Sequence, residues 1–97
     1  MRTLTALFTI LIISAFAAGA MAEARLEGVL AGVREVLPNL PDSAVVRADS
    51  GGERKGGHSA TKRALRRSGR TLIGAGNDPA ALGALQAIVE AGAGDRC

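Results

Sequence analysis

The N-terminal segment is the feature that most constrains this chain. Arg2 precedes a run from Thr3 to Ala22 that holds no charged side chain and is rich in Leu, Ile, Phe and Ala. The run ends in small residues, and Ala20-Met21-Ala22 fits the A-x-A pattern of a cleavage site. A basic start, an apolar middle and a small-residue end are typical of a secretory signal peptide. We therefore predict a signal peptide over residues 1–22, cleaved after Ala22.

A membrane anchor is the alternative interpretation of the same segment. A run of about 20 uncharged residues is just long enough to cross a bilayer. In that case residues 3–22 would hold the protein in the inner membrane, and the membrane would be contacted only through this uncleaved leader. With cleavage, the protein would be periplasmic or secreted. Both alternatives predict export of the rest of the chain.

The chain after the predicted leader forms one small domain. Both phenylalanines precede Ala22, so residues 23–97 contain no aromatic side chain. Large aliphatic residues make up about a fifth of this part, which is close to the composition of disordered chains. We therefore expect a domain of marginal stability over residues 23–92, followed by a flexible tail over residues 93–97.

Hydrophobic spacing predicts the order α-β-α-β-α after the leader, in a small α/β or α+β domain. Apolar residues from Leu26 to Leu37 recur at helical spacing, and Pro38 stops that helix. Asn77-Asp78-Pro79 is a strong helix start. The two strands would form a sheet covered by the helices, and a mostly α-helical, partly disordered chain is the alternative. The expected elements are a helix over 23–37, a strand over 44–48, a loop over 49–58, a helix over 59–68 capped by Ser59, a strand over 71–75 and a helix over 78–91.

Two glycine-rich stretches approach nucleotide-binding motifs without completing them. Residues 52–59 read GERKGGHS, which is a phosphate-binding loop with His58 where the motif requires lysine. That lysine matters because its ammonium group contacts the β- and γ-phosphates. Gly74-Ala75-Gly76 begins a dinucleotide fingerprint, but Pro79 stands at its third glycine position. We therefore predict no nucleotide and no cofactor.

Residues suited to catalysis or metal binding are scarce and scattered. His58 is the only histidine and Cys97 the only cysteine, and the acidic residues are dispersed. A metal site needs about three or four ligands, and no such cluster is evident. We predict that the protein is not an enzyme and holds no metal. Cys97 is expected to be an exposed thiol at the chain end, with an intermolecular disulfide as the alternative.

A run of basic residues is the strongest candidate for a binding site. Between Arg54 and Arg70 there is no acidic residue, and on the predicted helix the basic side chains would share one face. Such a face attracts anionic lipid, anionic glycan or an acidic protein. Nucleic acid is not expected, because single-strand binding relies on aromatic stacking. The candidate residues are Arg54, Lys55, Lys62, Arg63, Arg66, Arg67 and Arg70.

Two other interpretations of the basic run and its flanking helices stay open. The basic face could simply be a solvated helix surface that aids solubility. The chain could also be a partly folded accessory subunit whose amphipathic helices complete a larger exported or membrane complex.

Overall fold

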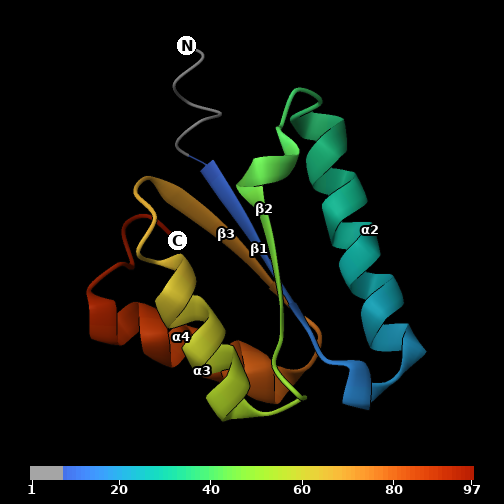
Figure 1. The fold of residues 1–97 in the computed structure, drawn as a ribbon, viewed down its shortest axis with the longest axis vertical. Helices are drawn as coiled ribbons and strands as arrows, with labels where there is room; N and C mark the ends of the chain where they lie inside the picture. Colours follow the sequence, from blue (N-terminus) through green and yellow to red (C-terminus); the bar gives the residue numbers. More distant parts are fainter. Residues whose placement is uncertain (1–7) are drawn as a thin grey trace.

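The protein folds as three parallel strands between two layers of helix, in a computed structural model that describes residues 8–97 (Figure 1). The strand order in the sheet is β2-β1-β3. The elements in chain order are β1 (Phe8–Ser14), the short 3-10 turn η1 (Phe16–Ala18), α2 (Ala20–Val36), the 3-10 turn η2 (Asp42–Ala44), β2 (Val45–Asp49), α3 (Arg54–Ala64), β3 (Arg70–Ala75) and α4 (Asp78–Ala91).

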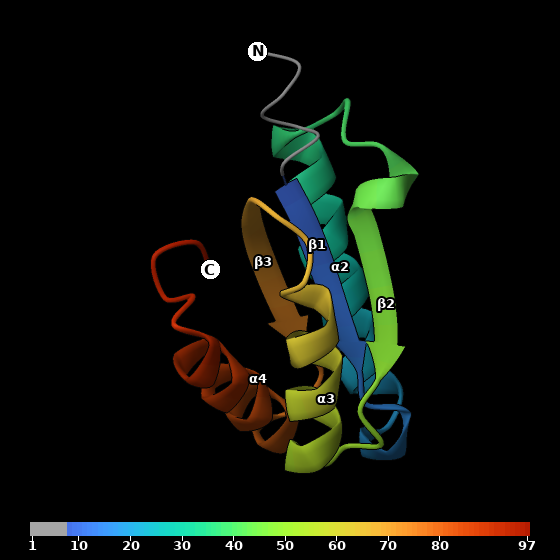
Figure 2. The same ribbon diagram turned by 60° about the vertical axis from the view of Figure 1, so that its left-hand side comes forward.

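One helix covers one face of the sheet, and two helices cover the other. Helix α2 lies on one side, while α3 and α4 lie together on the opposite side (Figure 2). The chain moves one way across the sheet from β1 to β2 and the opposite way from β2 to β3. Crossovers of the same hand that run in opposite directions must place their helices on opposite faces. The two-sided cover therefore follows from the strand order.

Strand β1 is the centre of the molecule. Residues 10–13 of β1 are at most 1% exposed, because both edges of the strand are paired and both faces are covered. Alternate side chains enter opposite layers: Ile10 and Ile12 pack with Leu26 and Leu30 of α2, and Leu11 and Ile13 pack against alanines of α3 and α4. A continuous apolar run is the pattern expected for such a strand.

The predicted mixed α/β class is confirmed, and the mostly α-helical alternative is wrong. The predicted strands over 44–48 and 71–75 appear as β2 and β3. They are parallel but not adjacent, because β1 lies between them. The prediction omitted β1, since it assigned those residues to a leader.

Helix boundaries agree with the sequence at α4 and disagree at α3. Helix α4 spans Asp78–Ala91, with the Asn77 side chain accepting from the Ala80 N–H and Gly92 in the left-handed conformation after its end. The predicted loop over 49–58 is too long, because the loop lies only between the end of β2 at Asp49 and the start of α3 at Arg54. The predicted N-cap at Ser59 is wrong, because Ser59 lies inside α3. The prediction that this helix continues to Ser68 is also wrong, because α3 ends at Ala64.

Glycines explain how α3 can begin inside a glycine-rich stretch. An added Cβ at Gly57 would collide with the Ala80 backbone, whose carbonyl carbon would lie 2.8 Å away. An added Cβ at Gly83 would lie 2.7 Å from the backbone nitrogen of His58. Two helix backbones can approach this closely only where no side chain separates them. The glycines expected to form a flexible loop therefore allow α3 and α4 to pack.

The C-terminal tail is held against the domain. Ala93 is buried at 2% exposure, and the Thr71 N–H donates to the Arg96 carbonyl at 2.9 Å. The Arg96 guanidinium donates to the carbonyls of Leu65 at 2.9 Å, Gly69 at 3.1 Å and Arg67 at 3.2 Å. These bonds satisfy carbonyls at and after the end of α3, which has no further turn to pair them. The segment expected to be flexible thus fixes the α3–β3 connection.

The predicted leader contributes both β1 and the start of α2. Its first part, residues 1–7, lies outside the described residues. Among residues 8–97, no helix is both long and apolar enough to cross a membrane. The fold described contains residues 8–22, so cleavage after Ala22 would remove its central strand. Export and cleavage stay predictions of the sequence.

Candidate anion-binding groove

The seven basic candidates lie in three consecutive elements rather than on one helix face. Because α3 ends at Ala64, the remaining cations follow a turn and then a strand instead of a continuing helix. Helix α3 carries the first four, the turn after it carries the next two, and β3 begins with the last: Arg54, Lys55, Lys62 and Arg63; Arg66 and Arg67; and Arg70.

Two of the seven cations are hydrogen-bonded within the domain. The Arg54 Nε donates to Gln86 Oε1 at 3.3 Å, and the Arg67 Nη1 donates to the Ser43 carbonyl at 3.2 Å. Lys62 lies close enough to Glu90 to help lower the pKa of that carboxyl. Within residues 8–97, no side-chain hydrogen bond or ion pair is formed by Lys55, Lys62, Arg63, Arg66 or Arg70.

A groove along β2 brings two of these arginines together. It lies between β2 and α3, has a volume of about 540 Å³, and is lined by Val46, Arg47, Ala48, Asp49, Ala60, Arg63, Ala64 and Arg67. A second hollow of about 440 Å³ lies at the other end of β2 and also includes Arg67. Its other lining residues are Phe8, Thr9, Pro41, Ser43, Ala44 and Ser68. Arg67 therefore borders both hollows.

The wall of the groove formed by β2 is an open strand edge. Strand β2 pairs only with β1 within the described sheet. Directly after β2, the Ser50 N–H donates to the Ser14 carbonyl at 2.8 Å, so the backbone N–H of Ser50 points toward β1. Since backbone groups alternate in direction along a strand, those of Arg47 and Asp49 face away from β1. An extended chain could bond to these groups as an added strand.

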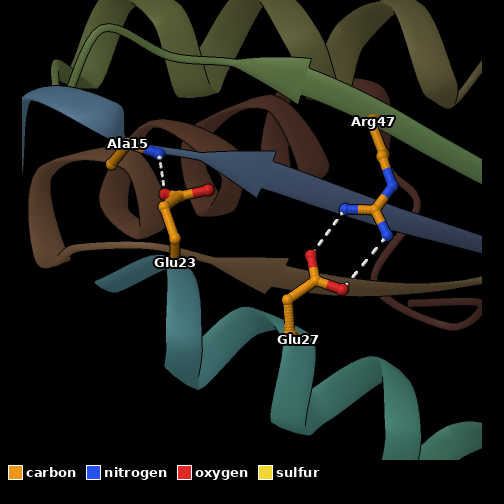
Figure 3. Close-up of polar contacts among 4 residues, drawn as sticks. All are labelled: Ala15, Glu23, Glu27 and Arg47. Carbon is orange, nitrogen blue, oxygen red and sulfur yellow. Dashed lines mark hydrogen bonds and ion pairs between the residues drawn. The ribbon is translucent and has the colours of Figure 1, made fainter. Parts of the chain in front are cut away.

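The Arg47 side chain is already paired on the other side of the sheet. Its guanidinium donates to both carboxylate oxygens of Glu27, at 2.8 and 3.3 Å (Figure 3). The hydrogen bond and the charge of Arg47 lower the pKa of Glu27. The positive charge available on the α3 side of the groove therefore comes mainly from Arg63, with Arg67 beside it.

An acidic residue of α2 secures the turn after β1. Glu23 Oε2 accepts the Ala15 N–H at 3.0 Å (Figure 3). Because this carboxylate lies in the first turn of α2, it also suits the positive end of the helix dipole. Glu23 therefore has a structural task and adds no site of its own.

The loops at the carboxyl edge of the sheet are bonded to one another. This edge is where open α/β sheets commonly bind ligands. Here the Ser50 Oγ donates to the Ser14 carbonyl at 3.0 Å, and the Asn77 Nδ2 donates to the Gly52 carbonyl at 3.0 Å. An added Cβ at Gly76 would lie 2.9 Å from that of Ala15. These contacts assign Gly52, Gly76 and Asn77 to packing between the loops.

The near phosphate loop takes a helical form instead of a cradle. Gly56 and Gly57 lie inside α3, and the Gly57 N–H donates to the Glu53 carbonyl at 3.2 Å. An added Cβ at Gly56 would lie 2.6 Å from the Ser50 Cα. A phosphate loop requires backbone amides free to surround the anion. Close packing accounts for these glycines.

His58 forms a pair that the sequence did not indicate. Its Nε2 lies 2.7 Å from Glu90 Oε1, between α3 and α4. Hydrogen bonds from His58 and then Gln86 lower the pKa of Glu90. The residues are far apart in the chain, so only the packing of the two helices reveals the pair. Cys97 is an exposed free thiol, and residues 8–97 contain no group of three His, Cys, Asp or Glu side chains that could hold a metal ion.

No protein family, curated protein or solved structure that we compared matches this chain.

Proposed function

We propose that the protein binds an extended acidic segment of a partner protein in the groove between β2 and α3. The observation that carries the proposal is the position of Arg63 and Arg67 beside an open strand edge. The backbone of β2 would hold the segment as an added strand, and the arginines would select acidic side chains. The proposal concerns the chain that retains residues 8–22, because β1 supports β2.

A groove favours a protein segment over a flat anionic surface. A membrane or a glycan coat would attract every exposed cation, and the attraction would be stronger for cations that lie closer to it. Lys55 and Arg70 would then contribute as much as the groove residues. An added strand instead makes Arg63 and Arg67 more important than cations placed elsewhere, and charge matching sets its specificity.

The test compares two variants with the same loss of charge. In Arg63→Gln/Arg67→Gln the groove loses its cations, whereas Lys55→Gln/Arg70→Gln removes two cations outside it. Binding of a labelled polyglutamate peptide is measured by fluorescence anisotropy at low and high salt. Each exposed ion pair contributes about 0.2–1 kcal/mol, so the groove variant should bind roughly 2- to 30-fold more weakly.

Two results would count against the groove. Equal losses in the two variants would indicate a diffuse charge effect, and anionic phospholipid vesicles would then be the better ligand. Binding by the wild type that does not weaken with salt would exclude the charge-based mechanism altogether.

A role as an accessory subunit is a second candidate, favoured by an apolar stripe on α4. Leu82, Leu85 and Val89 recur at helical spacing and are 51%, 56% and 71% exposed. A larger complex could cover them. This candidate predicts gradual, non-cooperative unfolding of the isolated chain, so a single sharp urea transition followed by circular dichroism would count against it.

A further inference from the structure

The outer face of α2 carries a stripe of small residues, with Arg25 and Glu35 as the charged side chains beside it. Turned away from the sheet and exposed to solvent are four small residues: Ala24, Gly28, Ala31 and Gly32. An added Cβ at Gly28 or Gly32 would meet no atom within 4 Å. Glycine in the middle of a helix costs stability relative to alanine, and packing within the described chain does not require it at these two positions.

The glycines of α3 and α4 show what such positions do elsewhere in this protein. At Gly57 and Gly83, an added Cβ would collide with the backbone of the neighbouring helix. At Gly28 and Gly32, by contrast, an added Cβ would meet no atom of residues 8–97 within 4 Å. A second helix could therefore approach the α2 backbone as closely as α3 approaches α4.

An apolar groove continues this face toward β3. It has a volume of about 420 Å³ and is lined by Phe8, Val29, Gly32, Val33, Val36, Leu37 and Leu72. Helix α2 packs over β1 and also covers Gly74 of β3, where an added Cβ would lie 3.5 Å from Leu26 and from Val29. Farther along, Leu72 of β3 is 41% exposed and Val36 of α2 is 77% exposed. The face thus combines small residues with apolar side chains that lack cover.

Two charges at the ends of the face identify its occupant. Arg25 and Glu35 are exposed, and neither forms an ion pair within residues 8–97. At about 100° per residue, both lie within roughly 80° of the Gly28–Gly32 stripe. The midpoint between Arg25 and Glu35 is Leu30, and Leu30 is also the midpoint between Gly28 and Gly32.

We propose that this face binds a second copy of the chain, with the two α2 helices antiparallel. The two-fold axis crosses α2 at the level of Leu30, on the side opposite the Leu30 side chain. In this arrangement Gly28 faces Gly32 of the second copy, and Arg25 faces Glu35 of the second copy. Symmetry forms each contact twice. A parallel arrangement would place like charges together, so the charges select the antiparallel one.

The same symmetry accommodates the exposed Val36. This valine lies level with Ala24 of the second copy, and the small alanine leaves room for the valine side chain as the helices approach. The β2–α3 groove is lined from the opposite face of the sheet, so acidic-segment binding and self-association use different surfaces.

Charge reversal tests the pairing directly. Sedimentation equilibrium is measured on the full chain over a range of concentrations. Arg25→Glu and Glu35→Arg each replace two attractive pairs with two repulsive ones, which should weaken the dimer about tenfold. The double variant Arg25→Glu/Glu35→Arg restores both pairs with reversed charge and should dimerise like the wild type. Arg66→Glu, a reversal away from α2, should leave the dimer unchanged.

Steric variants test the close approach. Gly28→Leu and Gly32→Leu add side chains into open space in the single chain, so the fold should be kept and its helix content should not fall. Both variants should be monomeric, because the added side chains separate the two helices. A wild-type chain that stays monomeric at every concentration overturns the proposal, as does a dimer that these leucines leave intact or a double charge reversal that dimerises no better than the single ones.

Discussion

Removing residues 1–22 should unfold the protein. These residues supply β1, whose four central side chains, residues 10–13, are at most 1% exposed. Full burial of a large aliphatic side chain contributes about 1.5–3 kcal/mol, so the four together contribute roughly 6–12 kcal/mol. A domain of this kind has a total stability of about 5–15 kcal/mol. The chain Glu23–Cys97 would also leave β2 and β3 without the strand between them.

The assay compares three chains by far-ultraviolet circular dichroism and urea unfolding. The full chain should unfold cooperatively, whereas Glu23–Cys97 should show no transition. Leu11→Ala retains the segment and should remain folded at low temperature, with its free energy of unfolding reduced by about 2–5 kcal/mol. A cooperative transition in Glu23–Cys97, with the spectrum of the full chain, would refute the assigned role of β1.

The mass of the protein isolated from cells tests the leader itself. A mass lacking residues 1–22 would support cleavage and export, and the folded state described here would then not persist after processing. An intact mass would support retention of β1. The two outcomes are exclusive, because the same side chains cannot be both removed and buried.

Four substitutions or conditions test other contacts. Gly57→Ala should lower the free energy of unfolding by about 1–3 kcal/mol by overpacking α3 against α4, which urea unfolding measures. Thr61→Val should leave stability unchanged or raise it, because the Thr61 hydroxyl is buried and has no hydrogen-bond partner within residues 8–97. Arg96→Ala should cost about 1–3 kcal/mol through its lost carbonyl bonds, seen as a lower urea midpoint. Because the pKa of Glu90 is lower in the folded state, ionised Glu90 stabilises the fold fully above pH 4.5, and this contribution is lost as the pH falls through the folded-state pKa. Glu90→Gln should therefore lower the Tm above pH 4.5 and leave it unchanged below the folded-state pKa.

The sequence predicted those elements whose signals are local. The start of helix α4 was predicted because Asn77-Asp78-Pro79 combines capping residues with a proline that suits a first turn, and in the structure Asn77 is the residue that caps the helix. Strands β2 and β3 were recognised from short apolar runs between turn residues. The mixed α/β class followed from their alternation with helices.

Strand β1 was not predicted because an unbroken apolar run is typical both of a central parallel strand and of a signal peptide. A central parallel strand is buried on both faces, so it reads as an unbroken apolar run. A signal peptide has an unbroken apolar middle for a different reason, since it must enter a membrane-bound export pathway. Between Thr9 and Ser14, composition alone cannot separate these two causes. The distinction depends on whether β2 and β3 pair with the run, and that pairing is long-range.

The candidate groove could not be predicted because its geometry depends on the tail. On a helix continuing to Ser68, Arg63 and Arg67 would be separated by one turn and would share a solvent face. The helix instead ends at Ala64, and Arg96 bonds the carbonyls that follow it. This turn allows Arg67 to reach the Ser43 carbonyl before β2. Arg96→Ala should therefore also weaken polyglutamate binding, although Arg96 does not line the groove. Without the Arg96 bonds, the guanidinium of Arg67 would lose its fixed orientation.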